Sequence, residues 1–194
     1  YTDDLAEMRN PANVIYDYLR SNRYGKGLDA SYLDLTSFQN ARNYCNTAGL
    51  TCDGAVQTSG TIFNNVNSLL SSANCNLVFS NGQYKLLPVK QESFSGAFEF
   101  NTSNIVGEWQ LALGSKKTRF NTFEVKFFNP DLDWQPDSIL IENATYLAED
   151  GGAVSQKAVD LPFASNATLA NKLATYYLDQ SRYQTVVNFK ATHA

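Results

Sequence analysis

The chain has 194 residues, with 15 Lys and Arg against 19 Asp and Glu, a net charge of −4 and a pI of about 4.9. Surfaces that hold nucleic acid need clustered basic residues, and here they cluster only at Lys116, Lys117 and Arg119, so nucleic-acid binding is not expected. No apolar run approaches the roughly 20 residues that span a bilayer, so membrane insertion is not expected either. Because the first residue is Tyr1 rather than Met, we expect a piece of a longer or processed polypeptide.

The first predicted element is a capped helix near the N-terminus. Asn10 is a favourable N-cap, and Pro11 suits the first helical position, where its missing N–H would have had no partner. Apolar residues then recur at helical spacing, and we expect the helix to end near Asn22. Gly25 and Gly27 predict a tight turn after it.

Four further elements complete the predicted N-terminal half. Thr36 caps a second helix that ends before Gly49, which suits the position just past a helix end. Residues 51–58 predict a short strand, and residues 61–74 predict a third helix. The run LVFSNGQYKLL at 77–87 predicts a β-hairpin, because Asn-Gly supplies the left-handed backbone that a two-residue turn requires.

The pattern changes from helix-rich to β-rich between residues 88 and 95, so we predict two domains, 1–92 and 93–194. Three phenylalanines (Phe94, Phe98 and Phe100) alternate weakly, and a clear strand follows. Further predicted elements are strands at 119–128, 138–142, 158–163 and 185–191, an irregular loop at 129–137, a turn at 148–152 and a helix at 166–182. The predicted fold class is α+β, with a helix-rich N-terminal half carrying a β-hairpin and a β-rich, barrel-like half carrying one long helix.

The chain offers few groups for catalysis. Its one histidine, His193, is next to the last residue, and terminal residues are seldom held firmly enough for acid–base chemistry. One His and three scattered Cys do not supply a usual zinc site, and no GxxxxGK[ST] or GxGxxG run is present for phosphate binding. We therefore predict no enzyme, no cofactor, and no catalytic, cofactor-binding or metal-binding residues.

Two groups of acidic residues leave alternatives open. Glu149-Asp150 before two glycines favours a polar turn, with a cell-wall hydrolase using one of these carboxyls as the alternative. Asp131, Asp133 and Asp137 are spaced as in a calcium loop, but a proline stands where that loop needs glycine, so an ordinary loop is favoured.

Aromatic residues make up 13% of the chain, which favours strands and large interfaces. We predict Tyr16, Tyr18 and Tyr24 as interface residues, because Tyr buries its ring while its hydroxyl stays at a wet edge. A ligand-stacking surface is the alternative. Trp134 is also predicted at an interface. It either plugs its loop onto the barrel or forms, with Tyr146, the platform of a carbohydrate-binding module.

The cysteines Cys45, Cys52 and Cys75 are odd in number and show no CxxC spacing. Free buried thiols, suited to a reducing compartment, are therefore expected rather than a disulfide framework. A bridge between Cys45 and Cys52 is the alternative.

Four stretches together resemble a known family. They are NPANVIYDYLRSNRYGKG (10–27), LDLTSFQNARNYC (33–45), TCDGAVQTSGTIFNNVNSLLSSANCNLVFSNGQYKLLP (51–88), and TRFNTFEVKFFNPDLDWQPDSILIEN (118–143) followed by YLAEDGG. In order and spacing they resemble the central hub region of tailed-bacteriophage tail-tip proteins, the host-specificity or tip-attachment protein J group and related baseplate hub proteins.

This resemblance implies a structural role in the virion tail. Such hubs are typically trimers that close the distal end of the tail tube and connect it to a fibre or spike. Their partners are other tail proteins, including the distal tail and tape-measure proteins, and they are made in the cytoplasm of the bacterial host. The family offers no catalytic residues to carry over. The fibre region is absent from this sequence, so the resemblance does not extend to receptor binding.

Overall fold

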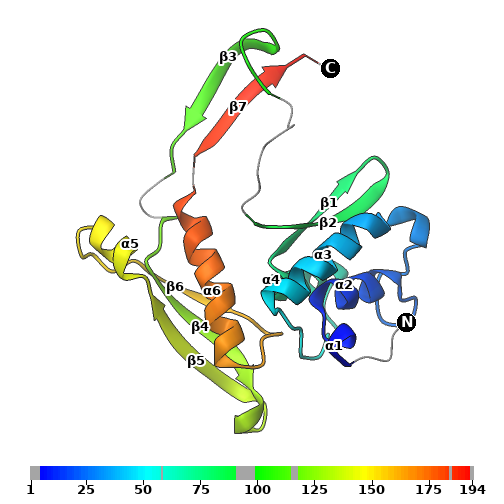
Figure 1. The fold of residues 1–194 in the computed structure, drawn as a ribbon. Helices are drawn as coiled ribbons and strands as arrows, with labels where there is room; N and C mark the ends of the chain where they lie inside the picture. The colour runs from blue at the N-terminus through cyan, green and yellow to red at the C-terminus, as the bar shows by residue number, and fades with distance from the viewer. Residues whose placement is uncertain (1–4, 58, 91–98, 115–117, 184, 193–194) are drawn as a thin grey trace.

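The structure is a computed structural model that describes residues 5–192 except 58, 91–98, 115–117 and 184. Figure 1 shows three parts. A helical half and a sheet covered by a long helix lie side by side, and a two-stranded ribbon extends away from both. The fold is α+β, as predicted.

The helical half holds four α-helices, a 3₁₀ turn and a β-hairpin. These elements are α1 (Leu5–Met8), α2 (Pro11–Arg20), the 3₁₀ turn η1 (Ala30–Tyr32), α3 (Leu35–Ala48), α4 (Ile62–Ala73), β1 (Cys75–Ser80) and β2 (Gln83–Pro88). The remaining elements are β3 (Ile105–Ala112), β4 (Thr122–Asn129), the 3₁₀ turn η3 (Pro130–Leu132), β5 (Gln135–Glu142), α5 (Ala144–Glu149), β6 (Gln156–Asp160), α6 (Ala167–Arg182) and β7 (Val186–Ala191).

The predicted start of α2 is confirmed, and its cap does more than the sequence indicates. The Asn10 side-chain oxygen accepts from the Ala12 N–H at 3.0 Å, which satisfies one of the free donors of the helix start. Its amide nitrogen donates to the Arg42 carbonyl oxygen at 3.1 Å and to the Asn46 side-chain oxygen at 2.7 Å. Asn10 is 1% exposed. One side chain therefore caps α2 and fastens it to α3.

Of the other two helix predictions of this half, one holds in part and one is confirmed. The second helix exists, but its cap is Asp34 rather than Thr36, because the Asp34 side chain accepts from the Ser37 N–H. Gly49 ends it with φ +62, the left-handed conformation that glycine adopts without strain. The third helix is confirmed with Thr61 as its N-cap.

The predicted hairpin is confirmed. Strands β1 and β2 pair antiparallel from Cys75↔Pro88 to Ser80↔Gln83, and both turn residues have positive φ (Asn81 +53°, Gly82 +78°). This is the backbone of a two-residue hairpin turn whose twist matches that of the flanking strands.

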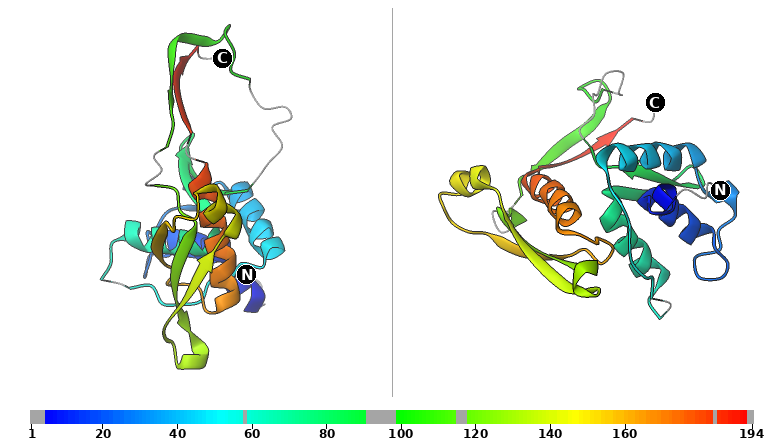
Figure 2. Two further views of the ribbon diagram at one scale, coloured as in Figure 1. Left: turned by 90° about the vertical axis from the view of Figure 1, so that its left-hand side faces the viewer. Right: turned by 60° about the horizontal axis from the view of Figure 1, so that its bottom comes forward.

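The sheet of the C-terminal half has the order β5-β4-β6, antiparallel between β4 and β5 and parallel between β4 and β6. Strand β4 alternates as predicted: Phe123, Val125 and Phe127 are buried, with exposed fractions of 3% or less. Helix α6, capped by Asn166, packs on that face and lies between the sheet and the helical half (Figure 2).

The prediction of a barrel-like half is wrong for the described part of the chain. The described strands of this half, β3 to β7, form two separate sheets, of two and of three strands, so no closed barrel is present among them. Strand β3 was not predicted. It pairs antiparallel with β7, from Ile105↔Ala191 to Ala112↔Val186, and Gly107 (φ +78) lies in an irregularity of the register.

Two smaller predictions also differ from the structure. Residues 51–57 do not form a strand, because their backbone bonds go singly to two separate segments: the Cys52 N–H donates to the Arg9 carbonyl and the Asp53 N–H to the Phe163 carbonyl. The loop predicted at 129–137 is shorter, since β5 already begins at Gln135. The short helix α5 was not predicted. The weak alternation at Phe94 and Phe98 lies outside the described residues.

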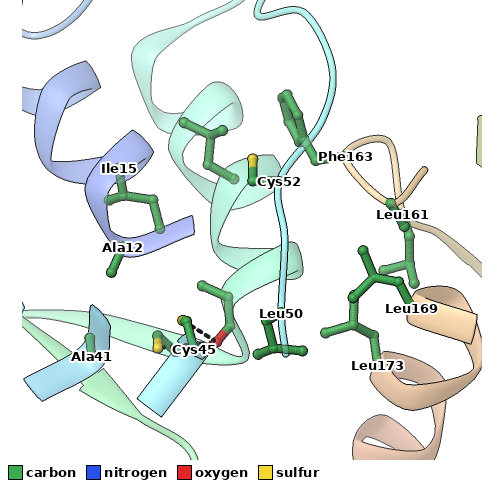
Figure 3. Close-up of a cluster of buried hydrophobic side chains, with 14 of the residues drawn as sticks. Ala12, Ile15, Ala41, Cys45, Leu50, Cys52, Leu161, Phe163, Leu169 and Leu173 are labelled. Atoms are coloured by element: carbon green, nitrogen blue, oxygen red, sulfur yellow. Dashed lines mark hydrogen bonds between the residues drawn. The ribbon is translucent and has the colours of Figure 1, made fainter. Parts of the chain in front are cut away.

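The hydrophobic core is continuous across the two halves. Figure 3 shows Leu50 facing Leu173 of α6, with Phe163 beside the segment that carries Cys52. Phe163 packs so closely that a Cβ on Gly54 would lie 2.7 Å from its ring. The described residues of both halves therefore contribute to one buried cluster. The division into two domains, 1–92 and 93–194, stays a prediction.

Polar contacts also join the two halves. Asp53 accepts from Arg9 at 2.6 Å and 2.5 Å and from the Ser165 hydroxyl at 2.6 Å. From α6, the Lys172 ammonium donates to the Ala48 carbonyl at 2.5 Å, and the Tyr177 hydroxyl donates to a carbonyl of α4 at 2.9 Å. Helix α6 is thus fixed to the helical half along much of its length.

Candidate functional site

Of the two acidic residues weighed as a hydrolase site, Glu149 is exposed and Asp150 is held by contacts within the scaffold. Asp150 makes a two-pronged ion pair with Arg182 of α6, with both oxygen–nitrogen distances at 2.9 Å, and accepts from the Asn121 amide at 2.9 Å. The hydrogen bonds from Arg182 hold the pKa of Asp150 below its ordinary value. A general acid needs a raised pKa, so this carboxyl is tuned in the opposite direction.

The surroundings of Asp150 complete a closed polar cluster. The Arg182 guanidinium lies over the Tyr146 ring at 4.4 Å from its centroid, a cation–π contact. The Tyr146 hydroxyl donates to an Asp179 carboxylate oxygen at 2.7 Å, which raises the pKa of Tyr146 to about 12. The cluster fastens α5 and its following turn to the C-terminal end of α6.

The two aromatic residues proposed as a carbohydrate platform lie apart. Trp134 is in the turn before β5, while Tyr146 follows the other end of that strand (Figure 1). At a rise of about 3.3 Å per residue, β5 alone separates them by roughly 23 Å, too far for one sugar ring to contact both. Trp134 is 51% exposed and does not plug its loop onto a barrel. Its φ of +58° is unusual for a bulky residue.

The acids near Trp134 make local contacts instead of a metal cage. Asp137 accepts from the Asn129 amide at 3.0 Å and from the Ser138 N–H at 2.8 Å. Within the described residues, no group of three or more His, Cys, Asp or Glu side chains is arranged to hold a metal ion.

The three predicted interface tyrosines of the N-terminal half lie in different settings. Tyr18 is 2% exposed, and its hydroxyl accepts from the Asn65 amide of α4 at 2.9 Å, so it belongs to the core. Tyr24 is 49% exposed and donates to the Asp17 carboxylate, which raises the pKa of the Tyr24 hydroxyl. Tyr16 is half-buried and packs edge-on against Phe38, with ring centroids 5.2 Å apart.

Tyr16 and Tyr24 line an open groove of about 850 Å³ formed mainly by α2 and α3. Its walls carry charges of both signs, Asp17 against Arg20, and the Arg20 guanidinium lies 5.9 Å from the centroid of the Tyr16 ring. Tyr16 and Tyr24 therefore share one surface. Tyr18 is buried in the core behind that surface, and Trp134 lies before β5 in the other half. Their interface role stays a prediction.

The ribbon of β3 and β7 carries a set of exposed apolar residues that sequence analysis missed. We define the ribbon face as Phe100, Trp109, Leu111, Leu113 and Val187, which are between 48% and 75% exposed. The run WQLAL does alternate, with Trp109, Leu111 and Leu113 on one side of the strand. That alternation was the available signal, and Gly107 and Glu108 before it interrupt the apolar pattern.

The cysteines are free and buried, as predicted, and no Cys45–Cys52 bridge is present. Burial raises the pKa of the Cys52 thiol to about 11, so that the unreactive thiol form dominates at neutral pH. Among the helices that the structure describes, none combines the length and apolar character needed to cross a bilayer.

Comparison with known proteins relates the chain to a bacteriophage protein. The chain is similar to baseplate hub protein pb3 of Escherichia phage T5. The two are 24% identical over 207 residues, which cover 92% of this chain and 21% of pb3, so the chain spans about a fifth of the length of that relative. No family model matches the sequence. The similarity to pb3 relates this chain to a bacteriophage baseplate protein along almost its whole length.

Proposed function

We propose that the chain is a structural part of a phage or prophage tail tip or baseplate hub, which closes the distal end of the tail tube and connects it to a fibre or spike. The single observation that carries this proposal is the similarity to pb3, which extends over 92% of the chain. A short shared motif could reflect one reused loop, but similarity across helical half, sheet and ribbon together favours a shared architecture.

The features of the surface support an assembly role. Asp150, one of the two carboxyls weighed for hydrolysis, is committed to an ion pair with Arg182, while an apolar face on β3 and β7 is open to solvent. Soluble monomeric proteins rarely expose large contiguous apolar patches, and such patches commonly mark contacts with other proteins. In this proposal the chain self-associates, as a trimer in the virion, and contacts the distal tail and tape-measure proteins and the fibre or spike.

Immunogold electron microscopy tests the location. Antibodies raised against this chain are applied to purified particles of the phage that encodes it, with pre-immune serum as the control. We expect gold at the distal end of the tail, and not on the head or along the tube. Particles that carry no gold, or gold on the head alone, would refute the proposal.

A further inference from the structure

The β3–β7 ribbon differs from a larger sheet because, among the described strands, its two strands pair only with each other. On the described residues each strand therefore has one edge of backbone N–H and C=O groups without a strand partner. Figure 1 and the left view of Figure 2 both show the ribbon extending away from the helices and from the other sheets. A two-stranded ribbon without cover is marginally stable in water, and free edges readily accept further strands.

The ribbon is also two-sided. Pairing of Leu111 with Val187 places them on the same side, and alternation adds Trp109 and Phe189 to that side. The Phe100 ring packs edge-on against Phe189, with centroids 4.8 Å apart, and extends the apolar surface. The ribbon face is therefore one continuous apolar side of the ribbon.

The opposite side is polar at its centre. Gln110 pairs with Asn188, and Val106 pairs with Lys190 on the same side. Glu108 is the charged residue of β3 and Lys190 that of β7, so the two strands of one ribbon carry opposite charges. Strand β3 from one copy of the chain is thus complementary in charge to β7 from another.

We propose that copies of this chain associate through their ribbons, with β7 of one copy pairing antiparallel to β3 of the next and with the ribbon faces turned to a common interior. This inference rests on the self-association in the proposed function. It adds the surface that mediates it. Under rotational symmetry about a shared axis, all copies of β3 run in one direction along the axis and all copies of β7 run in the opposite direction. The strands therefore alternate in direction around the ring.

Both needs of the ribbon are met by this arrangement. Edge pairing satisfies the free backbone groups, and closure of the ring buries the ribbon face. An eight-stranded barrel is just wide enough for side chains to fill, so three or four copies, with two strands each, form a closed barrel with a packed interior. Repeated contacts between unlike edges give a ring when the last copy meets the first. They give a filament when the series of copies does not close.

The size of the contact sets its strength. From its exposed fractions, the ribbon face offers about 500 Å² of apolar surface per copy, counting aromatic side chains at roughly 150–250 Å² each. This is somewhat less than the ~800 Å² per partner of a standard stable interface, so the ribbon alone gives an association that depends on concentration.

The test uses the chain itself. Light scattering coupled to gel filtration measures its mass from about 1 μM to 1 mM, the range of weak to moderate affinities. We expect mass to rise with concentration for the natural sequence and to stay monomeric for Leu111→Lys. The matched control, Asn188→Lys, adds the same charge on the polar side, to the strand that already carries Lys190, and we expect it to associate like the natural sequence. Leu111 is already 50% exposed, so circular dichroism should show an unchanged fold.

Trp109 provides a second readout. In Trp134→Phe, Trp109 is the only tryptophan left, and it is 59% exposed in the isolated chain. Its fluorescence emission should shift to the blue as concentration rises, and Leu111→Lys should abolish the shift.

Three results would overturn the inference and leave the location of the protein in the particle unaffected. One is a natural chain that stays monomeric at all concentrations. Another is association that Leu111→Lys leaves intact, which would assign self-association to a different surface. Blue-shifted Trp109 emission only on adding another tail protein, with no self-association, would make that protein the occupant and equally contradict the proposal. Gold labelling of the tail tip can succeed or fail independently of all three.

Discussion

Truncation of Leu173 tests whether the two halves of the chain form one folding unit. Leu173 lies on α6 with no exposed surface and faces Leu50 of the helical half (Figure 3). Leu173→Ala removes buried methyl groups and leaves a cavity between halves that are tied together by hydrogen bonds, so the site cannot collapse easily. We expect a loss of about 3 kcal/mol in the free energy of unfolding, within the range for buried Leu→Ala changes.

Urea denaturation followed by tryptophan fluorescence measures this loss. With a urea dependence of about 2 kcal/mol per molar, a loss of 3 kcal/mol lowers the midpoint by roughly 1.5 M. Leu140→Ala is the matched control. Leu140 is 65% exposed and lies on β5, in the sheet that α6 covers. We therefore expect its truncation to change the free energy of unfolding by under about 0.5 kcal/mol.

Hydrogen exchange then distinguishes one unit from two. Because the core is continuous, Leu173→Ala should speed the exchange of amides in α2 and α4 as well as in α6 and β4. Faster exchange confined to α6 and β4 would refute the reasoning and favour independent domains at 1–92 and 93–194. Both tryptophans lie in the C-terminal half, so fluorescence alone cannot make this distinction.

Three further predictions concern single contacts. Gly25→Ala places a Cβ 1.7 Å from the Tyr18 carbonyl oxygen, so we expect a loss of about 3 kcal/mol in calorimetry, and an unchanged melting temperature would contradict the steric argument. Asn10→Ala removes a cap and leaves buried groups of α3 without a partner, which should cost about 2 kcal/mol in urea denaturation. Burial alone would raise the pKa of Asp53, but hydrogen bonds from Arg9 and a serine outweigh it, so its folded-state pKa is lowered. Its stabilising effect is thus present above the unfolded pKa of about 3.9 and is lost as pH falls through the folded value. The stability gap between the natural chain and Asp53→Asn should shrink between about pH 4 and pH 2, and a gap that stays constant would show that ionisation of Asp53 is irrelevant.

Local sequence signals predicted the local elements well. Asn10 with Pro11, Asn166, Gly49 and the Asn-Gly turn each act within a few residues, so their effect can be read without knowing the neighbours. Where two capping residues lay close together, as with Asp34 and Thr36, the choice depended on which side chain reached the free N–H groups.

Features that depend on distant partners were not predicted. Strand β3 pairs with β7 some 80 residues later in the chain, and β6 lies parallel to β4, so neither pairing leaves a local trace. The distinction between Tyr18 and Tyr24 has the same cause. Both belong to one aromatic stretch, but only the position of α4 and its Asn65 makes Tyr18 a core residue.

The burial of all three thiols makes this chain a convenient starting point for labelling. Cys45, Cys52 and Cys75 are 0%, 8% and 6% exposed, so maleimide reagents have little access to them at neutral pH. A single cysteine placed on the surface, for instance at Gln110, would then be the preferred point of attachment for a fluorophore. Energy transfer between donor- and acceptor-labelled molecules could follow how copies come together in real time, with no native cysteine replaced.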